Sequence, residues 1–117
     1  MKSEKSVIDF EQLHQLSGQD PEFELELLQL FIEDSVNQLK TLKTAIVNQD
    51  AESIRNIAHY LKGASANLGA NLVYHSAFKL EGAAREHQLE NVESLFVELK
   101  TGLNQVQDYL SDQVSES

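Results

Sequence analysis

The sequence of 117 residues contains no cysteine, no tryptophan, one proline and five glycines. Without cysteine, disulfides, thiolate metal sites and cysteine nucleophiles are excluded. With so few glycines and prolines, long uninterrupted helices are favoured. No segment approaches the roughly 20 apolar residues that a membrane-spanning helix needs. The N-terminus lacks the apolar run of a signal peptide, so we expect a cytoplasmic protein that does not contact membranes.

Basic residues are also scarce, with nine Lys and Arg against 19 Asp and Glu, and a formal net charge of −10. Such a chain is repelled by nucleic acid at long range, which argues against nucleic-acid binding. Asp and Glu are absent from Ser53 to Leu80, a window that contains Arg55, Lys62 and Lys79. The absence of acidic residues from this window has two explanations: chance clustering in a short chain, or a surface that receives an anionic group.

Helix boundaries can be predicted from a few polar residues and glycines. A short N-terminal helix should end near Gly18, and Asp20 followed by Pro21 is a typical helix start. Asp50 is placed to cap a third helix over about 51–68, which Gly69 should end. Asn71 can then begin a fourth helix.

Apolar residues recur at steps of three and four, the spacing that places them along one face of a helix. They are Ile8, Phe10, Leu13 and Leu16 in the short helix, Leu25, Leu28, Ile32, Val36, Leu39, Leu42 and Ile46 in the second helix, Val73, Ala77, Leu80 and Ala84 in the fourth, and Val92, Leu95, Leu99, Leu103, Val106 and Leu110 in the last. The prediction is an all-α fold, an antiparallel up-and-down four-helix bundle with a short additional N-terminal helix. We expect residues 1–117 to form one domain that ends in a polar tail at 111–117.

His59 is predicted to point away from the core. At about 100° per residue around the helix axis, the apolar residues of the third helix lie within roughly 50° of one common direction. His59 lies roughly 170° from that direction, on the opposite side of the helix. The residues of that face are Ile54, Ile57, Ala58, Leu61, Ala64, Ser65 and Leu68. His59 should therefore be exposed, either as an ordinary surface histidine or as a functional one.

Three neighbours favour a functional role for His59. Lys62 and Gly63 lie one turn further along the same face, where an ammonium group can neutralise phosphoryl oxygens. Gly63 costs about 1 kcal/mol relative to alanine on an exposed helix, and together with Ala66 it leaves room for another protein to approach. A neutral imidazole is nucleophilic near neutral pH. The sequence has no nucleotide-binding motif, so we predict a phosphoryl carrier without kinase activity of its own.

The segment Ala58–Ala70, AHYLKGASANLGA, resembles the signature of histidine phosphotransfer (Hpt) domains. That signature is a histidine, any residue, a leucine, Lys-Gly and small residues, and then an apolar residue followed by glycine. The similarity continues through residues 58–85, whereas the rest of the chain agrees only as a helical bundle. Ala64 departs from the pattern, because many relatives have serine there.

The resemblance implies that His59 is phosphorylated on Nε2, that Lys62 assists the phosphoryl group and that Gly63 clears space for a receiver domain. Glu81 would orient His59 through Nδ1, although an ordinary carboxylate at the edge of the core is an equal alternative. Arg85 would pair with Glu81 or with the phosphoryl group. The residues expected to contact the partner are Arg55, Ala66, Asn67 and Arg85.

The partners implied by the resemblance are receiver domains of response regulators, with a hybrid histidine kinase as a candidate donor. Mg²⁺ would belong to the receiver, so no cofactor or metal is expected in this chain, which should act as a monomer. One alternative is the phosphoacceptor domain of a larger hybrid or chemotaxis-type kinase. Another is a helical adaptor that binds receivers without being phosphorylated.

Overall fold

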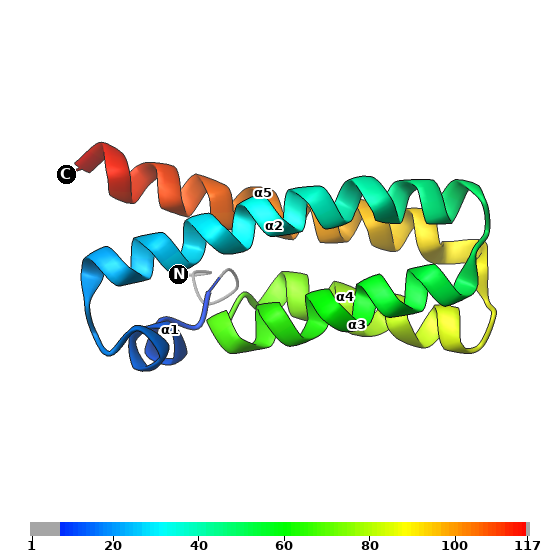
Figure 1. The fold of residues 1–117 in the computed structure, drawn as a ribbon, viewed down its shortest axis with the longest axis horizontal. Helices are drawn as coiled ribbons and strands as arrows, with labels where there is room; N and C mark the ends of the chain where they lie inside the picture. The colour runs from blue at the N-terminus through cyan, green and yellow to red at the C-terminus, as the bar shows by residue number, and fades with distance from the viewer. Residues whose placement is uncertain (1–7, 117) are drawn as a thin grey trace.

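Helices make up nearly all of the computed structural model, which describes residues 8–116. They are α1 (Phe10–Ser17), α2 (Pro21–Val47), α3 (Ala51–Leu68), α4 (Asn71–Arg85), the 3-10 turn η2 (Leu89–Asn91) and α5 (Val92–Glu116). Figure 1 shows the four long helices side by side, with α2 and α5 in one layer and α3 and α4 in the other. The all-α antiparallel bundle with a short N-terminal helix is confirmed. Within residues 8–116, no helix is long and apolar enough to cross a membrane.

The predicted capping residues form the helix boundaries. Asp20 accepts hydrogen bonds from the backbone N–H groups of Glu22 and Phe23, and Asp50 accepts one from Ser53. Gly18 and Gly69 end α1 and α3 in the left-handed conformation, with φ of 69° and 75°. The helix α5 continues to Glu116, so the polar segment 111–116 extends the helix, and residue 117 lies outside the described residues.

The core lies between the two layers and uses most of the predicted apolar positions. Phe10 and Leu16 of α1 are exceptions, at 38% and 45% exposure, so the prediction that they belong to the buried face is wrong. Val36 of α2 is a third exception, at 38% exposure, while Phe31 and Ser35 of the same helix are buried. Along a helix of 27 residues, a spacing of three and four residues is compatible with more than one buried face. The face that is buried is the one against which α1, α3 and α5 pack. The prediction that Val36 faces the core is therefore wrong.

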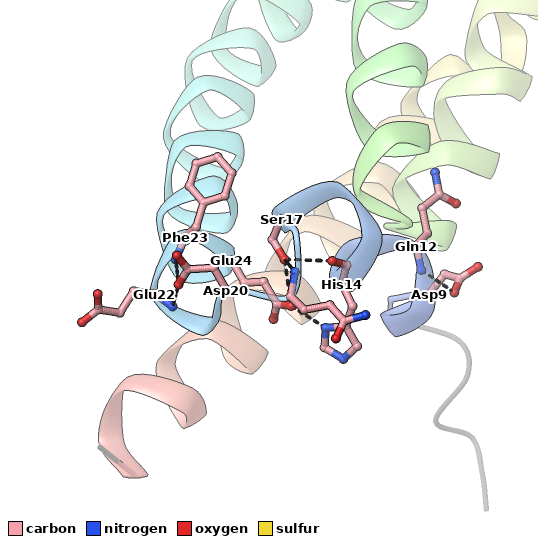
Figure 2. A network of polar contacts seen from close by, with 9 residues as sticks. Asp9, Gln12, His14, Ser17, Asp20, Glu22, Phe23 and Glu24 are labelled. Carbon is pink, nitrogen blue, oxygen red and sulfur yellow. Dashed lines mark hydrogen bonds and ion pairs between the residues drawn. The ribbon is translucent and has the colours of Figure 1, made fainter.

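A polar network fixes the short helix α1 between the start of α2 and the turn between α3 and α4. Glu24 of α2 is nearly buried, accepts a hydrogen bond from Ser17 Oγ at 3.0 Å and pairs with Nδ1 of His14 (Figure 2). On the other side, the Asp9 N–H donates to the Gly69 carbonyl at 2.6 Å. The helix α1 therefore connects the two layers at one end of the bundle.

Gly69 is the glycine on which this connection depends. Its φ of 75° is unfavourable for any side chain, and a Cβ there would lie 2.8 Å from both Cβ and O of Asp9. We expect Gly69→Ala to lower the free energy of unfolding by more than the about 1–2 kcal/mol of left-handed strain alone. Urea unfolding measures this loss.

Gly18→Ala is the matched control, because Gly18 has a φ of 69° and no atom within 4 Å of an added Cβ. Gly18→Ala should therefore lower the free energy of unfolding only by the backbone strain of the left-handed conformation, without the steric overlap with Asp9. Equal losses in the two variants would contradict the role assigned to the contact with Asp9.

Candidate functional site

His59 lies on the outer face of α3, as predicted, with 70% of its side chain exposed. The neighbouring residues Ala58 and Leu61 are buried in the core, which holds this face of the helix outward. The rest of the predicted apolar face is buried as well, apart from the half-buried Ala64. A partner molecule therefore has access to the imidazole.

Glu81 of α4 is the centre of the polar cluster around His59. Its Oε2 lies 2.9 Å from His59 Nδ1, and its Oε1 lies 2.8 Å from Lys62 Nζ. An Arg85 guanidinium nitrogen lies 3.6 Å from Oε2, one turn along the same helix. Only 9% of the Glu81 side chain is exposed. One carboxylate thus meets three potentially cationic groups from two helices.

The short connection between α3 and α4 explains this meeting. Only Gly69 and Ala70 separate the two helices, so they form an antiparallel hairpin in which residues at similar distances from the turn lie at the same level. His59 and Glu81 are 22 positions apart and satisfy this relation. The hairpin therefore places an acceptor beside the inner ring nitrogen of His59.

Glu81 is ionised at neutral pH. Burial opposes the charge, but the hydrogen bonds from Lys62 and His59 and the positive charge of Lys62 outweigh burial and hold the pKa of Glu81 below its ordinary value. A carboxylate beside Nδ1 favours the tautomer in which Nδ1 carries the proton and donates it to Glu81. Nε2 is then left with its lone pair on the exposed side of the ring.

Lys62 is directed toward Glu81 and packs against an aromatic ring. Its Nζ lies 5.8 Å from the centroid of the Phe78 ring, and 26% of its side chain is exposed. Phe78 is 56% exposed and was not identified from the sequence. The available signal was an aromatic residue outside the apolar stripe of the fourth helix, but which residue of α3 it contacts depends on how the helices pack.

Tyr60 is a second exposed aromatic residue that sequence analysis did not assign to the site. It follows His59, is 48% exposed and donates a hydrogen bond from its hydroxyl to Asp34 of α2. This hydrogen bond raises the pKa of Tyr60. Tyr60 thereby ties the exposed edge of α3 to α2.

Gly63 faces open space. Within residues 8–116, no atom outside the surrounding turns of α3 lies within 4 Å of where its Cβ would be, so packing among these residues does not require glycine there. Its backbone is helical and has no positive φ. Glycine at this exposed position lowers the stability of α3 relative to alanine, and the fold gives no reason for it.

The remaining predicted site residues fall into two groups. Arg55 and Arg85 line a shallow cavity of about 280 Å³ together with Glu52 and His87, one turn from the His59–Glu81 pair. Ala66 and Asn67 lie at the end of α3, where their carbonyl groups accept hydrogen bonds from the Gln12 side chain of α1. The sequence analysis did not predict that Gln12 would contact Ala66 and Asn67, because a contact between residues so far apart in sequence depends on where α1 packs.

Comparison with known proteins identifies the family of this bundle. The model of the Hpt domain family matches residues 26–109, which include all of α3 and α4. The chain is 30% identical over 100 residues to the phosphorelay intermediate protein rdeA of Dictyostelium discoideum. This alignment covers 86% of the chain but only 39% of the length of the Dictyostelium protein.

Solved structures agree with this assignment. Histidine-containing phosphotransfer protein B from Pseudomonas aeruginosa PAO1 has a TM-score of 0.87 at 27% identity, over 95% of this chain and 96% of that one. A histidine-containing phosphotransfer protein from Medicago truncatula has a TM-score of 0.80 at 25% identity, over 96% of this chain and 82% of that one. The chain therefore belongs to the Hpt domain family.

Proposed function

We propose that His59 accepts a phosphoryl group from the aspartate of a receiver domain and passes it to a second receiver. The observation that carries this proposal is the geometry of the imidazole. Nδ1 is held by Glu81 at 2.9 Å while the ring stays 70% exposed, so the other nitrogen faces solvent. A nucleophile held by a second group in this way is the general arrangement for covalent catalysis.

In the forward step, the Nε2 lone pair attacks phosphorus in line with the bond to the receiver's aspartyl oxygen. The N–P bond forms as the P–O bond breaks, and the receiver's carboxylate leaves with the electron pair. The proton on Nδ1 stays in its hydrogen bond to Glu81, whose negative charge stabilises the positive charge that the ring gains. The reverse reaction on a second receiver returns the imidazole to its starting state.

Lys62 and Arg85 supply positive charge beside the transferred group. Both contact Glu81, at 2.8 Å and 3.6 Å, so their side chains already lie next to the imidazole. Phosphoryl oxygens on Nε2 would attract these cations. Mg²⁺ bound by the receiver would neutralise the phosphoryl group from the opposite side.

The receiver would dock over the outer face of α3. Gly63 and Ala66 have small side chains or none, so little protrudes from this face toward a receiver. Arg55 and Asn67 offer polar groups at its two ends. The proposal further takes residues 1–117 as one domain that acts as a monomer in the cytoplasm, with a hybrid histidine kinase as a candidate source of phosphate. An adaptor that binds receivers without accepting phosphate is the alternative that a transfer assay separates.

We expect His59→Gln to abolish phosphoryl uptake from a radiolabelled, phosphorylated receiver while the circular dichroism of the helices stays unchanged, because glutamine lacks the nucleophilic nitrogen. His75→Gln is the control, since His75 is an exposed histidine of α4 outside the Glu81 cluster. The label on the wild type should be acid-labile and base-stable. Uptake by His59→Gln at the wild-type rate would refute the assignment.

We expect Lys62→Ala to slow transfer by about tenfold or more, or to shorten the lifetime of the phosphohistidine, because the variant lacks a cation at the developing phosphoryl charge. Rapid-quench measurement of label on the protein gives both quantities. Lys79→Ala provides a comparison, since Lys79 is an exposed lysine whose nearest ion pair, to Glu98, is at 3.9 Å. Identical kinetics in Lys62→Ala and wild type would remove the proposed role.

Replacing Glu81 tests whether its acceptor oxygen orients His59. Glu81→Gln keeps an acceptor for Nδ1–H and should retain most of the transfer rate. Glu81→Leu removes the acceptor and should lower the rate by about 10- to 100-fold, the usual effect of losing an orienting partner of a histidine. Equal rates in the two variants, with both proteins folded, would show that Glu81 is only an ordinary carboxylate at the edge of the core.

A further inference from the structure

A groove lies between α2 and α5, on the side of the bundle opposite His59. The helix α2 packs against α3 and α5, and α4 packs against the same two helices, so the α2–α5 pair is opposite the α3–α4 pair that carries the His59 cluster (Figure 1). The groove encloses about 250 Å³ and is lined by Val36, Leu39, Lys40, Lys43, Phe96, Lys100, Leu103, Asn104 and Gln107. It is therefore separate from the phosphoryl site.

The floor of this groove is apolar and its rim is basic. Leu39 and Leu103 are buried at 9% and 3% exposure, and Phe96 is half-buried against the core. Val36, the apolar residue of α2 that is displaced from the core, lies along the same wall. Among the described residues that line the groove, the charged ones are three lysines and none is a carboxylate.

The three lysines are unusual in a chain with a net charge of −10 and only nine basic residues. Lys62, Lys79 and Arg85 each pair with a glutamate, whereas Lys40, Lys43 and Lys100, like Arg55, make no ion pair with a carboxylate of residues 8–114. Like charges gathered along one groove repel one another and disfavour the compact state. An anion bound between them would remove this repulsion.

We propose that this groove binds a small amphiphilic anion, a carboxylate or phosphate carried on a compact apolar or aromatic body. The anionic group would lie among Lys40, Lys43 and Lys100, and the apolar body would rest on Leu39, Phe96 and Leu103. The groove volume of about 250 Å³ is just below the lower limit of about 300 Å³ for pockets that bind drug-sized ligands. The apolar part of the ligand must therefore be small. A ligand in this groove leaves His59 accessible, and the proposal does not depend on phosphoryl transfer.

Titration of the ¹⁵N-labelled protein with naphthoate, followed by NMR, tests this site. We expect saturable shifts of the backbone amides around Lys40, Lys43 and Lys100, and much weaker binding of naphthamide, the neutral analogue of the same shape. Lys43→Gln and Lys100→Gln should each weaken naphthoate binding about two- to fivefold, the effect of one partly exposed charge pair. Lys79→Gln, which changes the net charge equally, should leave the affinity unchanged.

Three outcomes would overturn the proposal. One is the absence of saturable shifts in the groove at naphthoate concentrations of about 1 mM, the weakest affinity that would count as a site. Another is equal affinity for naphthoate and naphthamide, which would indicate apolar adhesion alone. The last is equal weakening by Lys79→Gln and the groove variants, which would indicate a response to net charge. The amide spectra of the variants show directly that they remain folded.

Discussion

The packing of α3 against α4 is the interaction on which the functional site depends. The two helices are joined by Gly69 and Ala70 alone, and the left-handed conformation of Gly69 allows the chain to reverse there. Burial of Leu61 and Leu80 between the helices then leaves His59 on the outside and places Glu81 at its level. A shift of α4 by one residue would turn Glu81 by about 100°, and the same shift of α3 would turn His59, so either would break the contact with Nδ1.

The Glu81 carboxylate adds the electrostatic part of the site. It is nearly buried, which would be costly without partners, and His59, Lys62 and Arg85 compensate for that cost. The same contacts prepare the imidazole, because a carboxylate at Nδ1 leaves Nε2 free to react. The contacts that stabilise the buried charge are thus the ones that would orient His59 in the proposed phosphoryl transfer.

The two sides of the bundle differ in how their basic residues are used. Around His59, Lys62 and Arg85 pair with Glu81, and Gly63 leaves open space on the same face of α3. Between α2 and α5, Lys40, Lys43 and Lys100 surround an apolar floor, and no carboxylate of residues 8–114 pairs with them. The bundle therefore carries basic residues on two opposite sides, paired with Glu81 on one side and without a carboxylate of residues 8–114 on the other.

The sequence by itself determined the helices and the exposure of His59, because capping residues and apolar periodicity act locally. Asp20, Asp50 and Gly69 mark boundaries that the structure reproduces, and the wheel of α3 separates His59 from its buried face. Only the tertiary structure decided which side chains meet. The resemblance to Hpt domains pointed to Glu81 as the partner of His59 and left an ordinary carboxylate as an equal alternative, and the packing of α3 on α4 brings the two to 2.9 Å. The contacts of Lys62 with Phe78 and of Gln12 with the Ala66 carbonyl join residues distant in sequence and were not predicted. The displacement of Val36 has the same origin, because the packing of three neighbouring helices, rather than periodicity, selects the buried face of α2.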